Sequence, residues 1–480
     1  MNYPVQAVIA ANRFGLGARP GDLTAISADP RGWLKSQLTG ERLAPSVITE
    51  LAASDEIYRA QVAALRARQE MQRNASESEN QTTTGGVVSN PILNNYQSQV
   101  VARYQVAIRS EESFRERLIH FWTNHFAVSM DKNIVSAMAG TLENEAIRPN
   151  IHRSFYDLLL AAEMHPSMIL YLDNQLSVGP NSGVAKIASQ RTNLQRLRKF
   201  DINENLGREI LELHTLGVSG GYTQDDVTRF ATVLTGWSIS DSQGPLALPV
   251  SVTGERERIP DGRFIFKSAL HEPDTQTVMG KRYSEQGIKQ GQSVLRDLAM
   301  HPSTANFIAT KLARHFISDQ PPITAIDRIA KAFLRSGGDL PTVHAAVVDS
   351  SEAWVSSVSK FKTPHELVIS TFRATNTIPD RSLLVLQPLQ ALGQSPYSPG
   401  SPAGWDDTAG RWDGSDALMK RIEWLTQFAQ RINRNQSPLY LAEQSLGEAI
   451  GEHTRMAVTN AADRVQGTVL WLVSPEFQRR

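Results

Sequence analysis

An acidic side chain lies within the apolar face of one predicted helix. In residues 203–217 (NENLGREILELHTLG), leucine and isoleucine recur at helical spacing, and a helical wheel places Glu209 between Leu213 and Leu216. Burial raises the pKa of a carboxyl group unless a cation, a metal or strong donors keep it ionised. Proteins prepare a general acid or base near neutral pH in this way. Glu209 is therefore a candidate catalytic residue.

Two further polar residues share the face of Glu209. Asn205 and Glu212 flank it at positions i−4 and i+3, so the three side chains form one polar ridge. We expect Glu212 to be the electrostatic companion of Glu209, and Asn205 to contact or orient a substrate. The structural alternative is that Glu204, Arg208 and Glu212 form ordinary ion pairs along the helix, while Glu209 bonds to a neighbouring helix end.

A histidine falls on the apolar stripe of a second predicted helix. In residues 112–129, Phe114, Leu118 and Phe121 share one stripe, and His125 lies within it. A buried imidazole needs a partner for each desolvated nitrogen, so His125 is either a site residue or a core histidine that bonds to a carbonyl and a hydroxyl. His120 points elsewhere, and we expect it at the rim of a site or on the surface.

Helical periodicity dominates the rest of the chain, which predicts one mainly α, irregular helical domain over residues 1–480. Residues 73–91 are expected to form a mobile polar loop, and residues 393–414 a Gly/Pro-rich loop that contains Trp405. Residues 238–287 are expected to form a small β-containing insertion, in which residues 263–267 can pair with residues 277–279. The expected helices are 21–39, 46–72, 92–110, 113–128, 132–147, 152–163, 203–216, 224–236, 287–300, 302–318, 323–335, 340–349 and 361–374, with further helices closing the chain.

The composition limits the classes of function. Hydrophobic residues make up 41% and charged residues 20% of the 480 residues, as in an ordinary soluble globular protein. Lys and Arg number 49, as do Asp and Glu, so the net charge of +0 gives no reason to expect a nucleic-acid partner. With no cysteine, disulfides, thiolate metal sites and a cysteine nucleophile are excluded.

Nothing in the sequence predicts a membrane span or a signal peptide. No window approaches the roughly 18 apolar residues that a spanning helix needs. The apolar patch near the N-terminus has no basic residue before it and no small-residue cleavage site after it. We therefore expect a cytoplasmic protein, with export to the periplasm while bound to a partner as the alternative.

Several motifs occur in a distinctive order. They are Arg13–Gly17 (RFGLG), His120–Phe126 (HFWTNHF), Tyr171–Asn174 with Ser177, Asn203–Gly217, Tyr222–Val227 (YTQDDV), Thr235–Trp237 and Ser474–Gln478 (SPEFQ). In order and spacing, over nearly the whole chain, the sequence resembles the bacterial domain-of-unknown-function family 1800.

The resemblance implies a set of characteristic positions and a partner, but no activity. The partner is a sulfatase-like member of domain-of-unknown-function family 1501, which carries a twin-arginine export signal and is typically encoded nearby. The characteristic positions are Asn124, His125, Glu204, Asn205, Arg208, Glu209, Glu212, Trp237, His271 and Trp405.

Three hypotheses follow. The first is an enzyme that hydrolyses a polar polymer such as a glycan by acid/base chemistry. Its catalytic residues would be Glu209, Glu212 and His125, and its substrate contacts Asn124, Asn205, Arg208 and Trp405.

The second hypothesis is a metal-dependent enzyme, and the third is a non-catalytic protein. For the metal enzyme, the candidate ligands for Zn, Mn or Fe are His125, Glu209, Glu212 and His271, without the paired E-x-x-H spacing of helical di-iron sites. The non-catalytic protein would be an assembly or export partner of the sulfatase-like protein, in which the same residues form a buried structural network.

Overall fold

The protein is mainly helical, as the sequence predicts. The computed structural model describes residues 3–40, 43–77, 91–190, 201–242, 244, 246, 259–356, 360–432 and 436–480. The strands within these residues form two small antiparallel sheets of two strands each. No helix of this described part is long and apolar enough to span a membrane.

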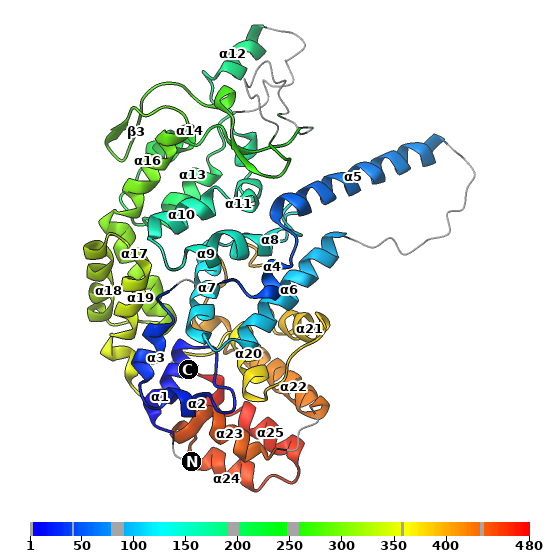
Figure 1. Ribbon diagram of the computed structural model, residues 1–480, viewed down its shortest axis with the longest axis vertical. Coiled ribbons are helices and arrows are strands. Elements are labelled where there is room, and N and C mark those ends of the chain that lie inside the picture. The colour runs from blue at the N-terminus through cyan, green and yellow to red at the C-terminus, as the bar shows by residue number, and fades with distance from the viewer. Residues whose placement is uncertain are drawn as a thin grey trace.

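Segments from the two ends of the chain pack together at one end of the molecule (Figure 1). The first segments comprise α1 (Val5–Ile9), the π-helix η1 (Ala10–Phe14), α2 (Asp22–Ile26) and α3 (Pro30–Ser36). The last ones comprise α22 (Ser415–Arg431), α23 (Pro438–Leu446), η9 (Gly447–Ala449), α24 (Glu452–Thr459), α25 (Arg464–Leu472) and α26 (Pro475–Gln478). The expected helix 21–39 is thus two helices, because Asp29 caps α3 and Pro30 begins it.

Helix α7 (Ser113–His125) lies at the centre of the molecule. Nearly all of its side chains are buried, including Arg115, Glu116 and Arg117, so neighbours cover every face of it. Helix α7 packs against η1 and α6 (Pro91–Arg109), and its side chains bond to α17 (Pro302–Phe316), α19 (Leu340–Val348) and α20 (Pro364–Ala374). Helix α18 (Ile323–Ser336) packs on α17 and α19, and α21 (Leu383–Ala391) packs on α6 and α20. Short 3-10 turns, η7 (Ser351–Trp354) and η8 (Ala409–Arg411), lie in the connections after α19 and α21.

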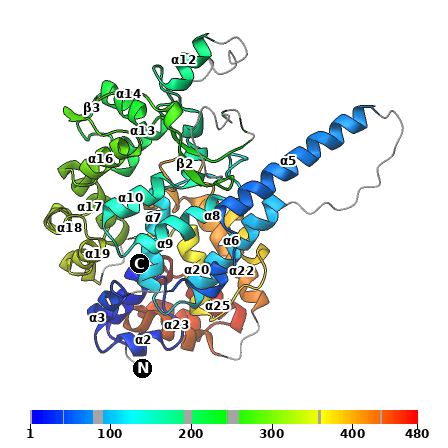
Figure 2. The ribbon, with the colours of Figure 1, turned by 45° about the horizontal axis from the view of Figure 1, so that its top comes forward.

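A second group of helices, with both sheets, occupies the other end of the molecule (Figures 1 and 2). It contains α8 (Ala139–Thr141), the π-helix η2 (Leu142–Ile147), α9 (Arg148–Asn150), α10 (Phe155–Glu163), α11 (Pro166–Tyr171), η3 (Asn174–Leu176), α12 (Gly183–Gln190), α13 (Asn205–Glu209), the π-helix η5 (Ile210–His214), α14 (Gln224–Val233), η6 (Ser268–Leu270) and α16 (Ile288–Ala299). The expected helix 132–147 begins only at Ala139, because residues 130–138 form turns and a bend, and most of it is the π-helix η2.

The expected pairing of residues 263–267 with 277–279 is wrong. Strand β2 (Phe264–Phe266) pairs instead with β1 (Trp237–Ile239), and β3 (Gln276–Val278) pairs with β4 (Lys281–Tyr283). The turn from β3 to β4 has Met279 at φ 50° and Gly280 at φ 72°. Two consecutive positive φ values are typical of two-residue hairpin turns. Strand β3 therefore pairs with the strand that follows this turn, and not with β2.

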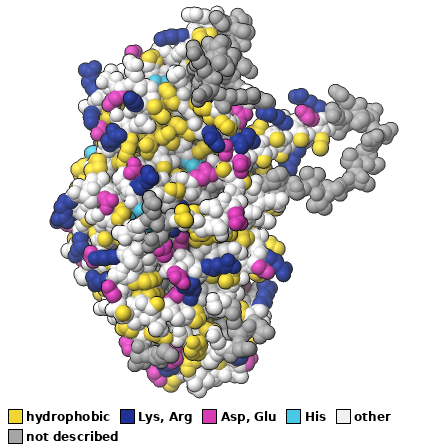
Figure 3. All heavy atoms as spheres, viewed as in Figure 1, with side chains coloured by type: hydrophobic (Ala, Val, Ile, Leu, Met, Phe, Trp, Pro, Cys, Tyr) yellow, Lys and Arg dark blue, Asp and Glu magenta, His cyan; other side chains and the backbone are white. Residues whose placement is uncertain are grey.

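Helix α5 (Ser54–Glu77) projects from the body beside the start of α6, as both ribbon views show (Figure 2). The expected helix 46–72 is therefore α4 (Ser46–Thr49) followed by α5. Helix α5 also includes the first residues of the expected loop 73–91, while residues 78–90 of that loop lie outside the described residues. On the face shown in Figure 3, basic and acidic side chains are interspersed rather than gathered by sign.

Candidate functional site

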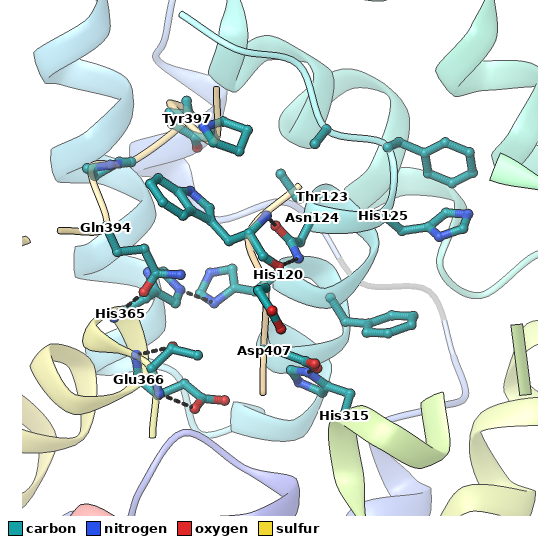
Figure 4. Close-up of a pocket in the computed structure, with 18 of the residues that line it drawn as sticks. His120, Thr123, Asn124, His125, His315, His365, Glu366, Gln394, Tyr397 and Asp407 are labelled. Atoms are coloured by element: carbon teal, nitrogen blue, oxygen red, sulfur yellow. Dashed lines mark hydrogen bonds and ion pairs between the residues drawn. The ribbon is translucent and has the colours of Figure 1, made fainter. Parts of the chain in front are cut away.

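A cavity of about 250 Å³ lies beside the central helix α7. Side chains of α6, α7, α17 and α20 line it, and the Gly/Pro-rich loop 393–414 closes one wall. Figure 4 shows that polar and imidazole groups from these separate segments point toward one another there. We call this cavity the central pocket.

Three side chains form a hydrogen-bonded chain that ends in the central pocket. The hydroxyl of Tyr104 is bonded to Nδ1 of His365, and Nε2 of His365 lies 3.0 Å from Nδ1 of His120 (Figure 4). The other nitrogen of His120, Nε2, is buried and has no hydrogen-bond partner among the described residues. His120 is only 7% exposed, so this nitrogen is a costly unpaired group unless a ligand or a water fills the pocket.

Both imidazoles of this chain are neutral at neutral pH. Burial lowers the pKa of His120 well below its ordinary value, and the charge of Arg103 lowers it further. Burial and Arg103 likewise lower the pKa of His365. Burial raises the pKa of Tyr104 well above its ordinary value, so the phenol keeps its proton.

A neutral chain of this kind has two tautomeric forms. When Tyr104 donates to His365, His365 donates to His120, and Nε2 of His120 then carries a proton that points into the pocket. When both imidazoles exchange their tautomers, Nε2 of His120 becomes a free base. The same nitrogen can thus donate or accept a hydrogen bond while the chain stays neutral.

A second histidine, His315 of α17, is bonded at both nitrogens. Its Nδ1 lies 3.0 Å from a carboxylate oxygen of Asp407, and its Nε2 accepts a hydrogen bond of 3.2 Å from Arg117. Burial lowers the pKa of His315 to about 4, although Asp407 opposes the shift. With both nitrogens occupied, His315 fixes the position of its neighbours and has no atom left for a substrate.

The floor below His315 is a buried ionic network. Glu366 pairs with Arg117, and its Oε1 lies 2.7 Å from Arg480. Burial alone would raise the pKa of Glu366, but the two guanidinium groups outweigh it and hold that pKa well below the ordinary value. The carboxylate is therefore ionised, and the network anchors α7 to α20 and to the last residue of the chain.

The predicted residues Asn124 and Trp405 meet at the pocket wall. The Asn124 side chain donates a hydrogen bond of 2.8 Å to the backbone carbonyl of Trp405 and accepts one of 2.7 Å from its backbone amide. One side chain thus pairs both backbone groups of Trp405. Gly404 has φ +80°, and a Cβ there would lie 2.3 Å from the carbonyl oxygen of Asn124. Only glycine adopts this backbone conformation readily and leaves room for Asn124 to lie so close. Gly404 therefore allows the backbone of Trp405 to bond to Asn124, which attaches the loop to α7.

His125 points inward, but away from the cluster around His120 (Figure 4). Its Nε2 lies 3.1 Å from the backbone oxygen of His214, and its Nδ1 has no partner among the described residues. Burial lowers the pKa of His125 well below its ordinary value, and Lys311 contributes in the same direction. His125 therefore connects the end of α7 to the π-helix η5.

Glu209 lies next to a fully buried acid–histidine pair. Nδ1 of His214 lies 2.7 Å from Oε1 of Glu163, and neither side chain is exposed. Glu209 itself is partly exposed, and burial raises its pKa, with Glu212 adding to the shift and His214 opposing it. The π-helix η5 begins directly after Glu209 and brings His214 inward, and such distortions are frequent at functional sites.

The remaining polar residues of this helix form the ion pairs of the structural alternative. Arg208 lies 2.9 Å from Glu204 and 3.5 Å from Glu212. Asn205 is exposed, and its backbone amide donates to the side chain of Asn203 at 2.9 Å. The central pocket is lined by none of these residues.

His271 lies in the β-containing segment, between β2 and β3. Its Nδ1 is 2.9 Å from the backbone oxygen of Thr235, and its ring contacts Phe266 with centroids 5.2 Å apart. Burial lowers its pKa. Across the described ranges, no group of three or more His, Asp or Glu side chains is arranged to hold a metal ion, so the metal hypothesis has no ligand cluster there.

The sequence missed most residues of the central pocket, and the expected surface or rim position of His120 is wrong. Helix α7 is covered on all sides, so its second, polar face is buried as well. One signal was present, because Arg117, His120 and Asn124 recur at helical spacing on that face. The other missed residues come from distant segments: Tyr104, His315, His365, Glu366 and Asp407.

Nearly the whole chain matches one family. The family model described as "Protein of unknown function (DUF1800)" matches residues 9–479, so the chain belongs to this family, as its motifs predict. Neither the curated proteins nor the solved structures contain a match to it.

Proposed function

We propose that this member of the DUF1800 family is a hydrolase that acts by general acid/base chemistry in the central pocket, on a polar substrate such as a glycan. The observation that supports this most strongly is the free Nε2 of His120, which is buried, faces a cavity, and is backed by His365 and Tyr104. An unpaired imidazole nitrogen that faces a cavity is available to a ligand that enters it.

In the proposed reaction, His120 moves the proton. In its free-base tautomer, Nε2 takes a proton from the attacking water, and it then returns that proton to the leaving group. Burial disfavours the imidazolium, so the proton stays on His120 only briefly. His365 holds the ring in place through its bond to Nδ1, so the same nitrogen of His120 takes up and returns the proton.

The size of the central pocket fits one unit of a polymer. Its volume of about 250 Å³ lies below the range of about 300–1,000 Å³ for drug-sized ligands. We therefore expect the end of a chain, or a small polar molecule, to enter it. Trp405, partly exposed at the wall, offers an aromatic face for a sugar ring.

The test is hydrolysis of a panel of oligosaccharides, compared between the wild type and His120→Asn. The asparagine amide can replace Nδ1 toward His365 but leaves no group at the position of Nε2. Loss of general acid/base catalysis is expected to lower kcat by about 10²- to 10⁴-fold with little change in KM. A matched control is His344→Gln, which changes a buried histidine outside the pocket that accepts from Trp122. Full activity of His120→Asn would refute the proposal.

A second candidate places the acid/base group at Glu209, as the sequence suggests. It is favoured by the raised pKa of Glu209 beside the buried pair of Glu163 and His214. Glu209→Gln then abolishes hydrolysis while His120→Asn does not, so the two variants separate the two sites. If the protein is instead a non-catalytic partner of a sulfatase-like protein, Glu209→Gln is expected to change only stability.

The proposed site fits either compartment that the sequence allows. We expect the protein in the cytoplasm, and the alternative is the periplasm, which it would reach bound to an exported partner. Fractionation of cells with and without the sulfatase-like gene distinguishes the two, because only co-export depends on that gene.

A further inference from the structure

Two cationic side chains of α17 line the central pocket without a counter-ion. Lys311 and Arg314 are three residues apart, so they lie on the same face of the helix, and both belong to the pocket wall. Within the described part of the chain, neither has a carboxylate within 4.0 Å or a hydrogen-bond acceptor, and Nε of Arg314 is a buried atom. The nearest aromatic contact of Lys311 is the ring of Phe307, at 5.6 Å.

Most other charged groups of the pocket have a bonded partner. Arg103 lies 3.3 Å from Glu143, and Asp407 is held by His315 and Lys360. Arg117 is likewise paired with a carboxylate in the floor. Asp406, the remaining acid of the lining, accepts hydrogen bonds from Thr408, and Asp407 favours the charged form of Lys311 from beyond 4.0 Å. Lys311 and Arg314 are therefore the cations of the lining that have no directly bonded counter-ion among the described residues.

The unpaired nitrogens of the pocket can all donate hydrogen bonds, so one acceptor, such as an anion, would suit each of them. Lysine and arginine are donors only, and Nε2 of His120 is a donor in one of its two tautomers. Burial lowers the pKa of Lys311 to about 8, with Asp407 opposing that shift and Arg314 adding to it. At neutral pH most Lys311 side chains are still charged, and a partly buried cation without an acceptor is unfavourable unless an anion joins it.

We propose that the central pocket binds an oxyanion, namely a carboxylate, sulfate or phosphate group of the substrate, between Lys311 and Arg314. This inference rests on the proposed function and names its substrate class, a polar molecule that carries a negative group. The anion would orient the substrate so that the bond to be cleaved lies next to His120. Arginine suits this role because its planar fork of donors matches two oxygens of one oxyanion.

The test uses inorganic sulfate, inorganic phosphate and acetate as probes, each titrated calorimetrically into the full chain against a chloride background of equal ionic strength. At least one probe is expected to bind saturably with a millimolar or lower Kd, and the double variant Lys311→Met, Arg314→Gln is expected to weaken its binding at least tenfold. The matched control is Lys331→Met, Arg335→Gln, which removes two exposed cations from the adjacent helix α18. Circular dichroism checks that both double variants are folded.

The outcomes separate this inference from the proposed function. Binding that the pocket variant loses and the control keeps supports an anion site, and the probe that binds most tightly identifies the oxyanion. No saturable binding, or binding that both variants keep, overturns the anion site but leaves His120 free to act on a neutral substrate. Anion binding together with full hydrolysis by His120→Asn refutes the proposed function alone.

Discussion

Mild acid is expected to destabilise this protein strongly, because it buries several histidines in the neutral form. Burial is the largest cause in each case, and it lowers the pKa to about 4 for His315 and about 3 for His344. For His120, His125 and His365 the pKa falls well below the ordinary value. In the unfolded chain all of these side chains regain a pKa of about 6.5.

The sign and the size of the effect follow from proton binding. Between pH 6.5 and the folded pKa, the unfolded chain binds protons that the folded protein does not, so stability falls as the pH falls. At pH 5.5 each such histidine lowers the free energy of unfolding by about 1.4 kcal/mol relative to pH 7.5, and the five together by about 7 kcal/mol. This loss is comparable to the whole stability of a typical domain, about 5–15 kcal/mol.

The buried carboxylates of the central pocket do not mask this loss in the same interval. Burial opposes ionisation of Asp407 and Glu366, but it is outweighed in both. A hydrogen bond from His315, with the charge of Lys360, holds the pKa of Asp407 below the ordinary value, and two guanidinium groups do the same for Glu366. These groups therefore stay ionised at pH 5.5 in both the folded and the unfolded state. Their contribution is lost only at lower pH.

The assay is urea denaturation followed by tryptophan fluorescence at pH 7.5 and pH 5.5. The urea concentration at the midpoint of unfolding is expected to be much lower at pH 5.5. Unfolding at that pH is expected to take up four to five protons, because each of the five histidines is about 90% protonated in the unfolded chain. In His344→Gln the pH-dependent loss should shrink by about 1.4 kcal/mol. Equal midpoints at the two pH values would show that these histidines are not buried as neutral groups.

Three substitutions test the framework of the central pocket. Gly404→Ala forces a Cβ into the Asn124 carbonyl at a positive φ, so we expect a loss of at least about 1–3 kcal/mol in chemical denaturation. Asn124→Leu leaves the Trp405 amide and carbonyl unpaired, which should speed hydrogen exchange at that amide, and an unchanged exchange rate would contradict the pairing. Glu366→Gln leaves Arg117 buried without its counter-ion, and its expected cost of about 3–5 kcal/mol should appear as a lower Tm.

Periodicity predicted the helices and some of their buried faces. The inward orientation of His125 and the placement of Glu209 in an apolar arc follow from 3.6-residue spacing alone. Asp29 and Pro30 explain why the expected helix 21–39 is two helices. Such capping signals locate the ends of a helix less reliably than periodicity predicts that a helix is present. The strand partners were not predictable, because strands of three residues carry too few side chains to specify a register.

Helical periodicity could not predict the residues of the central pocket. A helical wheel shows which face of a helix is most apolar. The prediction then assumes that the opposite, polar face is exposed to solvent. Helix α7 is enclosed on all sides, so His120 lies on a second buried face that has a polar composition. Its partners Tyr104 and His365 are far away in the sequence, and no local pattern joins them.

This separation along the sequence has a consequence for how the protein is made. Tyr104 and His365 are 261 positions apart, His120 and His365 are 245 apart, and Arg117 and Glu366 are 249 apart. Contacts between such distant residues form late, because the chain must close large loops before they contribute any stability. A chain leaving the ribosome therefore carries His120 without its backing histidine until α20 has been synthesised. Incomplete chains lack the hydrogen-bonded chain of Tyr104, His365 and His120 altogether, so translation has to pass most of the molecule before the proposed site can form.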